Sequence, residues 1–306
     1  MFTKKNRNIF LSGVFTLATL ASCSTKEEAI STTAKEVATA PVAGLIEQPN
    51  PFQNQCSYVD NNWSNASVLS TSFGSTTDTN FMNGQNSKIA TVWNRPVPTL
   101  RFVVDASNPG STYNAISYST GKIYFGQAIY KDAKSKNSNN IVNAMILAHE
   151  FGHQLQYAFN LPSTKESTQR PNELEADGFA GYYLRKPAGF NASTFAAIAS
   201  GSDFAFAIGD YQTTSQGHHG TPPQRRSAVR LGFLLADPAN GNLTASNFDY
   251  NFFYYYNGVL NGTYRMNQSK PETMTLEGHN LIMVHLDELR KIANGTMSDA
   301  EYHNLQ

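Results

Sequence analysis

The chain has 306 residues, of which 40% are hydrophobic, and it carries equal numbers of basic and acidic side chains, 23 of each. This length suits one sizeable core with additions better than two equal domains. Balanced charge without a long basic run argues against a nucleic-acid partner, and two cysteines are too few for a disulfide framework.

The first 22 residues are typical of a bacterial export signal. Three basic residues precede a short apolar run, residues 9–20, which is too short to span a bilayer as a mature helix. The run ends in Leu-Ala-Ser before Cys23, which resembles the lipobox of bacterial lipoproteins. We expect Cys23 to be lipidated, with an ordinary cleavage site or a short anchor helix as the alternatives. Cys56 would then be an unpaired structural thiol.

The remaining chain divides by composition. Residues 23–55 are rich in Ser, Thr, Ala and Pro and predict a flexible tether, and residues 56–306 form the expected folded domain. Because Ser24 rather than aspartate follows the cysteine, analogy with lipoprotein sorting favours the outer membrane, with the domain facing either the periplasm or the cell surface.

Three short runs in the first half of the domain predict β-strands. They are Thr99–Asp105, Ala115–Tyr118 and Lys122–Phe125, and they predict a small antiparallel sheet. Residues 138–140 can cap a helix that continues to about Phe159.

This helix contains the sequence H-E-F-G-H, made by His149, Glu150 and His153. Histidines four apart lie on one face of a helix, so both imidazoles can reach one metal ion. Glu150 sits roughly 100° round the helix, where a carboxylate can act as general base towards a water molecule at the metal. The bare pattern also arises by chance, so its interpretation depends on a third ligand.

A second helix, residues 171–184, supplies candidates for that ligand. Glu173 and Asp177 fall on one face of it, and the twenty residues after His153 are enough for the chain to return. Glu175 is the rival third ligand, although it points about 200° away from Glu173. Two histidines and one glutamate leave a metal position open, which is the arrangement of a catalytic rather than a structural zinc site.

The segments AHEFGHQLQ and ELEADGFAG resemble those of the bacterial neutral zinc metallopeptidases, relatives of the gluzincins with an E-x-x-A-D element. The resemblance continues with I-G-D at residues 208–210 and H-G-T-P-P-Q-R at residues 219–225, and it covers about residues 117–235. One departure is Ser227-Ala228-Val229, where the family usually has a tryptophan.

The resemblance implies an α+β, zincin-like fold with one Zn²⁺ ion, in which Glu150 is the general base. The ligands that it implies are His149, His153 and Glu173. Asp177 would orient a ligand histidine through its ring N–H, and Arg225 would have a structural role, paired with Asp177 or Asp210. His219 would hydrogen-bond the oxyanion of a tetrahedral intermediate or a nearby acid, unless it only packs the loop.

The same resemblance implies an edge strand that binds extended substrate by strand addition, for which Ile123–Gln127 is the candidate. The alternative is that the sheet only packs on the helix. Residues 237–306 lie beyond the resemblance and predict a helical extension with a terminal helix at about 276–292. The aromatic run 248–256 is either core or an exposed wall. Three further histidines in the extension are interpreted as structural, namely His279, His285 and His303.

The sequence therefore predicts a lipid-anchored zinc metallopeptidase, a hydrolase of the cell envelope that acts on peptides or proteins. Its only predicted membrane contact is the lipid on Cys23. The alternative interpretation is a non-catalytic zinc-containing lipoprotein that serves as a scaffold or binding module.

Overall fold

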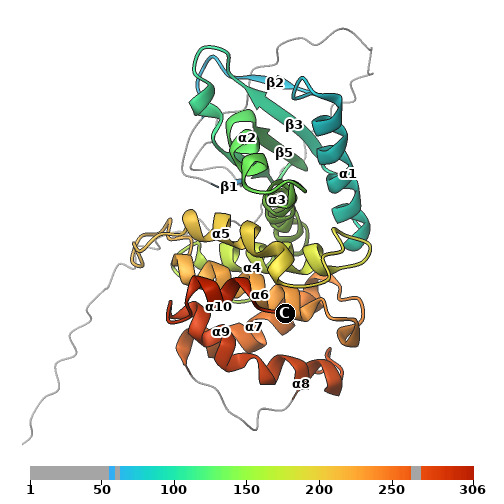
Figure 1. The fold of residues 1–306 in the computed structure, drawn as a ribbon, viewed down its shortest axis with the longest axis vertical. Coiled ribbons are helices and arrows are strands. Elements are labelled where there is room, and N and C mark those ends of the chain that lie inside the picture. The colour runs from blue at the N-terminus through green and yellow to red at the C-terminus, as the bar shows by residue number, and fades with distance from the viewer. Residues whose placement is uncertain (1–54, 59–62, 263–269) are drawn as a thin grey trace, which may run out of the picture.

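The computed structural model describes residues 55–58, 63–262 and 270–306 (Figure 1). The expected signal peptide, the tether before residue 55 and the lipidation site Cys23 lie outside the described residues. The described part of the chain has an α+β fold, in which one sheet packs against a larger body of helices. None of its helices combines the length and the apolar character that crossing a membrane requires.

Five strands of the described chain form one sheet, in the order β1-β4-β5-β3-β2. Their bounds are β1 Gln55–Ser57, β2 Val68–Ser70, β3 Thr99–Val104, β4 Ala115–Tyr118 and β5 Lys122–Gly126. The predicted antiparallel sheet is wrong in one pairing, because β3 and β5 are parallel and the other pairs are antiparallel. After β3 the chain passes through a 3₁₀ turn and forms the β4–β5 hairpin, whose second strand returns beside β3.

The prediction that Ile123–Gln127 is an edge strand is also wrong. Strand β5 is the central strand, with β4 on one side and β3 on the other, so its main-chain groups are already paired. The hairpin that places β5 there turns at Gly121, which has a φ of +77° and donates its N–H to the carbonyl of Tyr118. Glycine adopts this left-handed backbone without steric cost.

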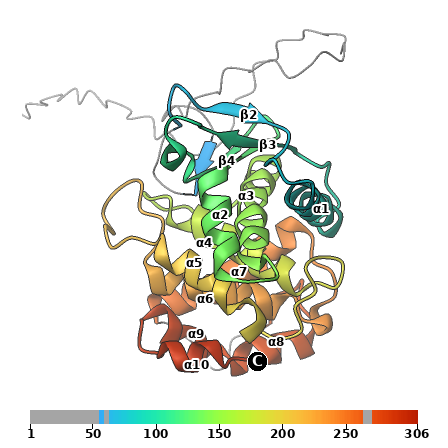
Figure 2. The ribbon, with the colours of Figure 1, turned by 45° about the horizontal axis from the view of Figure 1, so that its top comes forward.

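Ten α-helices and three 3₁₀ helices complete the described residues. The α-helices are α1 Thr76–Val92, α2 Gln127–Lys136, α3 Ile141–Phe159, α4 Arg170–Arg185, α5 Ala199–Ala207, α6 Pro222–Leu235, α7 Ala245–Asn261, α8 Leu276–Val284, α9 Leu286–Ala293 and α10 Asp299–His303, and the 3₁₀ helices are η1 Pro109–Thr112, η2 Ala196–Ile198 and η3 Pro238–Asn240. Figure 2 shows α2 and α3 running from the sheet towards the C-terminal helices.

The predicted terminal helix at 276–292 is two helices rather than one. His285 leaves helical geometry, with φ −98° and ψ 0°, so it ends α8 and begins α9. The aromatic run 248–256 belongs to α7 and is mainly core, because Phe248, Phe252 and Tyr256 are fully buried while Tyr250 is exposed.

Helices α4 and α6 approach each other unusually closely because glycines face backbone at their crossing. A Cβ on Gly181 would lie 2.1 Å from the carbonyl oxygen of Val229, and one on Gly232 would lie 1.9 Å from that of Gly178. This contact holds the second half of α6 against α4, and Arg225, one to two turns earlier in α6, meets the polar groups described next.

Candidate metal centre

Helix α3 presents the two histidines of the H-E-F-G-H sequence inside the protein. The helix begins after Asn140, where the side chain of Asn139 accepts the N–H of Ile141. Almost all of its residues are buried, and the side chains of His149 and His153 are fully buried one turn apart. Buried imidazoles need polar partners, because an unpaired polar group in an apolar interior costs free energy.

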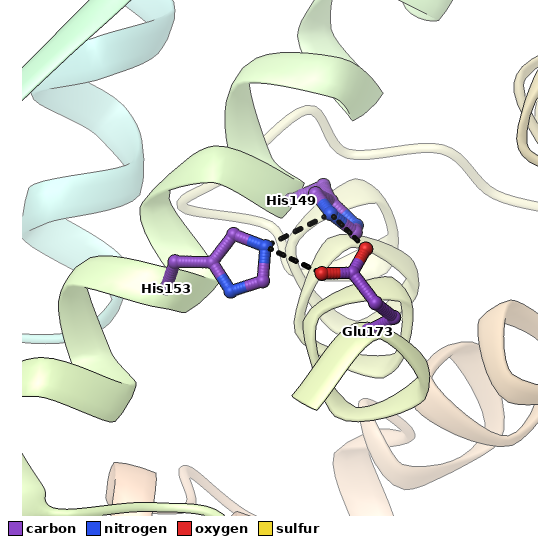
Figure 3. A group of neighbouring side chains, drawn as sticks. All are labelled: His149, His153 and Glu173. Atoms are coloured by element: carbon purple, nitrogen blue, oxygen red, sulfur yellow. Dashed lines mark hydrogen bonds and ion pairs between the residues drawn. The ribbon is translucent and has the colours of Figure 1, made fainter. Parts of the chain in front are cut away.

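The imidazoles of His149 and His153 meet the carboxylate of Glu173 from α4 (Figure 3). The two Nε2 atoms are 3.1 Å apart, and the carboxylate oxygens of Glu173 lie 3.4 Å from Nε2 of His149 and 3.5 Å from Nε2 of His153. One ligand atom from each residue falls within 4.8 Å of the others, so this buried group could hold a metal ion.

The support of His149 is ionic. Its Nδ1 lies 2.9 Å from Oδ1 of Asp177. The carboxylate of Asp177 also accepts two hydrogen bonds from the buried guanidinium of Arg225 in α6, one at each oxygen. Burial opposes charging of His149, but the hydrogen bonds and charges of Asp177 and Glu173 outweigh it and raise the pKa to about 9. Burial alone would raise the pKa of Asp177, but Arg225 and His149 hold it below its usual range.

The support of His153 is neutral. Its Nδ1 lies 2.7 Å from Oε1 of Gln156, and the amide of Gln156 donates to the carbonyl oxygen of Asn172 and to Glu175. Burial lowers the pKa of His153 to about 4. Glu175, the rival third ligand, does not join the metal-binding group, and burial and the neighbouring Asp249 raise its own pKa.

Glu150 follows His149 on the helix and is completely buried. Neither of its carboxylate oxygens has a hydrogen-bond partner of normal geometry among the described residues. Burial raises its pKa to about 8, a rise that the charge on His149 and the backbone of Ser117 in β4 partly oppose. A fully buried carboxylate without a well-formed hydrogen bond is costly, so its place beside the two histidines calls for a chemical reason.

The loop before α6 brings two histidines to the same region. The carboxylate of Asp210 accepts two hydrogen bonds, one of 2.7 Å from Nδ1 of His218 and one of 2.9 Å from the backbone N–H of His219. Nδ1 of His219 lies 3.9 Å from Oε2 of Glu173, so His219 adjoins the metal-binding group. Nε2 of His218 is buried and has no hydrogen-bond partner among the described residues.

A cavity of about 460 Å³ lies beside this loop. Both histidines line it, together with Tyr58, Phe204, Ile208 and Asp210. Of the two pairings that the sequence leaves open for Arg225, the structure shows the one with Asp177.

Sequence reasoning missed three residues of this site. Gln156 lies three residues after His153, a helical spacing that could have identified it as a hydrogen-bond partner. His218 has no counterpart in the family pattern described above, although the I-G-D segment supplies its carboxylate. Tyr58, which packs edge-on against His149, gives no local sequence signal because it lies 91 positions before it.

The histidines of the C-terminal extension lie elsewhere and have local partners. Nδ1 of His279 lies 2.8 Å from the hydroxyl of Tyr255, and Nδ1 of His285 lies 3.0 Å from Glu288. The ring of His303 bonds Asp203 near the surface. None of the three belongs to the metal-binding group found in the described residues.

Comparisons with protein-family models, curated proteins and solved structures found no match. The case for a function therefore rests on the residues and their geometry.

Proposed function

We propose that this chain is a zinc-dependent metallopeptidase. Two buried imidazole nitrogens and one carboxylate on neighbouring helices are the donor set of many catalytic zinc sites. Oε2 of Glu173 is buried without a hydrogen-bond partner among the described residues, as expected of an oxygen that a cation would satisfy. Imidazole suits zinc among the common divalent metals, which favours Zn²⁺ over calcium or magnesium.

The observation that carries the proposal is Glu150, a buried carboxylate placed one residue after a ligand histidine and without a hydrogen-bond partner of normal geometry among the described residues. When bound, zinc supplies Lewis acidity, which activates water and polarises a carbonyl group. Glu150 takes the proton of the attacking water and delivers it to the leaving amine. A purely structural metal site has no need of such a carboxylate.

Two histidines compete for the role of hydrogen-bond donor to the oxyanion. His219 lies beside Glu173, whereas His218 lines the cavity with its ring fixed by Asp210 and its Nε2 without a hydrogen-bond partner among the described residues. A ring held through its Nδ1–H presents Nε2 to substrate, and Nε2 donates to the oxyanion when the ring carries its second proton. We therefore add His218 to the proposed catalytic residues beside His219.

The proposed location is the cell envelope, with the chain anchored through lipid on Cys23 at the outer membrane and acting on peptides or proteins. The complete burial of His149, Glu150 and His153 favours a second candidate, a zinc-containing lipoprotein that binds a partner without catalysis.

The test is Glu150→Gln. We expect this variant to keep one zinc per chain and to lose peptide hydrolysis by about 10²–10⁴-fold, the usual contribution of a positioned acid or base. Metal analysis and cleavage of a casein panel measure the two effects, and Glu277→Gln on the exposed start of α8 is the matched control.

The outcomes separate the candidates. Cleavage by Glu150→Gln at the wild-type rate would show that the mechanism is wrong. Zinc without cleavage in the wild-type chain, across both casein and a proteome-derived peptide library, would support the non-catalytic lipoprotein.

A further inference from the structure

Strand β1 occupies the outer edge of β4. Its three residues pair antiparallel with β4, with Gln55 opposite Tyr118 and Cys56 opposite Ser117, and the next N–H, that of Tyr58, donates to the carbonyl of Ala115. The backbone of Ser117 in turn faces the carboxylate of Glu150 and partly opposes the rise in its pKa. The sheet edge nearest the proposed catalytic carboxylate is therefore covered by a short segment of the chain itself.

The side chain of Tyr58 continues from this segment into the metal-binding region. Its ring packs edge-on against His149, with 4.9 Å between ring centroids, and stacks on Phe204 at 6.2 Å. The guanidinium of Arg225 lies 5.6 Å from the ring centroid. Tyr58 is only 1% exposed, yet its hydroxyl has no hydrogen-bond partner among the described residues.

Tyr58 also lines the cavity that contains His218 and His219. The same side chain thus contacts His149 on one side and the cavity on the other. Because His149, Glu150 and His153 are fully buried, no peptide reaches them while this arrangement persists. Because Tyr58 lies between the cavity and His149, movement of the segment that carries it would open a path to the metal-binding group.

We propose that the segment Gln55–Tyr58 is a built-in occupant of the peptide-binding edge, and that an extended peptide with an aromatic side chain binds by displacing it. The inference rests on the proposed peptidase function. Main-chain pairing along β4 would bind peptides of many sequences, and the space taken by the Tyr58 ring would select an aromatic residue.

Two features suit a displaceable occupant better than a permanent core element. The strand has only three residues, so few hydrogen bonds hold it. The buried hydroxyl of Tyr58 lacks a partner among the described residues, which makes its resting place less favourable than a position where that group is hydrogen-bonded or hydrated. A competing peptide regains the same backbone pairing along β4.

The chain offers a covalent test through Cys56, whose partner in the register is Ser117. Directly opposed residues of an antiparallel pair lie within disulfide distance, so Ser117→Cys can lock β1 to β4. The full chain with Cys23→Ser and Ser117→Cys is oxidised with oxidised glutathione or reduced with a phosphine. The control adds Cys56→Ser and cannot form the lock.

The probe is a fluorescein-labelled peptide of residues 53–60 with serine for Cys56, and its binding to the metal-free chain is followed by anisotropy. We expect the oxidised, disulfide-locked chain to bind the peptide at least tenfold more weakly than the reduced chain. The control variant should bind it equally well under oxidising and reducing conditions. Tyr58→Ala in the unlocked chain should strengthen binding, and a peptide with alanine for tyrosine should bind less well.

Failure to form the disulfide, or equal binding with and without it, would overturn the inference. If binding ignores the lock while the zinc-loaded chain cleaves casein, only the inference fails. If binding follows the lock but no peptide is cleaved, the peptidase proposal fails and the displaceable occupant remains.

Discussion

The two histidines of the metal-binding group direct the same ring nitrogen to one place, with their ring planes 86° apart, but differ in the groups that support them. Each ring directs Nε2 towards the other and towards Glu173, and each is fixed through Nδ1. Nδ1 of His149 contacts Asp177, which is ion-paired with Arg225, whereas Nδ1 of His153 contacts the neutral amide of Gln156. The partner at Nδ1 is therefore charged for His149 and neutral for His153.

The difference appears in proton affinity. The carboxylate contacts raise the pKa of His149 to about 9, whereas burial next to a neutral amide lowers that of His153 to about 4. In the metal-free chain, His149 therefore carries a second ring proton at neutral pH, whereas His153 is a neutral imidazole with a single N–H. The ionic support makes His149 the more basic ligand, and the amide fixes ring orientation without adding charge.

Breaking the ionic support should have the largest effect. Asp177→Asn removes the charge that compensates the buried guanidinium of Arg225, and an uncompensated buried charge costs about 3–5 kcal/mol. We expect the free energy of unfolding of the metal-free chain to fall by that amount in urea titration.

The matched control is Asp237→Asn, which breaks the partly exposed ion pair with Arg185. Pairs near the surface contribute below about 1 kcal/mol, so this variant should remain close to wild type. Equal losses in the two variants would show that the support of His149 is not specially buried or ionic.

Breaking the neutral support should mainly affect metal binding. Gln156→Leu removes the oxygen that accepts a hydrogen bond from Nδ1 of His153, and it also removes the amide N–H that donates to Glu175. Loss of such a partner lowers metal affinity by about 10–100-fold. We expect this change in competition with a zinc chelator, together with a loss of stability of about 1–3 kcal/mol from the unpaired groups.

Gln154→Leu is the control on the same helix, because Gln154 bonds to Ser117 and to the carbonyl of Tyr118 and to neither ligand. It should lose stability and keep zinc affinity. A Gln156→Leu variant with unchanged zinc affinity would contradict the proposed role of the amide.

The sequence predicted the part of the site that local periodicity governs. His149 and His153 share a helix, and Glu173 and Asp177 share the next one, so helical spacing alone placed each pair on a face. The two long helices also have clear end signals. This explains why the helices that carry the candidate ligands were predicted to within a few residues at each end.

The sheet and the surroundings of the site depend on contacts between distant segments. The parallel pairing of β3 with β5 follows from the path of the chain between them, which no local pattern records. Tyr58 and His149 meet only because β1 covers the edge of β4. Likewise, Arg225 pairs with Asp177 and leaves Asp210 to His218 because of how α6 packs on α4.

The smallest predicted effect is a pH dependence that should distinguish the two histidines. Zinc must displace the proton on His149, so zinc affinity should fall about tenfold per pH unit below about pH 9. His153, with a pKa of about 4, should add nothing near neutrality. Glu150, with a pKa of about 8, titrates in the same range, so the measurement uses Glu150→Gln.

Titration calorimetry at pH 7 in buffers of different ionisation enthalpy counts the protons released. We expect about one per zinc in Glu150→Gln, and less than one when Asp177→Asn is added, because loss of the carboxylate charge lowers the pKa of His149. Adding Gln156→Leu instead should leave the count unchanged, since the amide carries no charge. If the two added substitutions changed proton release equally, the ionic and the neutral support would be electrostatically equivalent, and the difference in basicity between the two rings would have another origin.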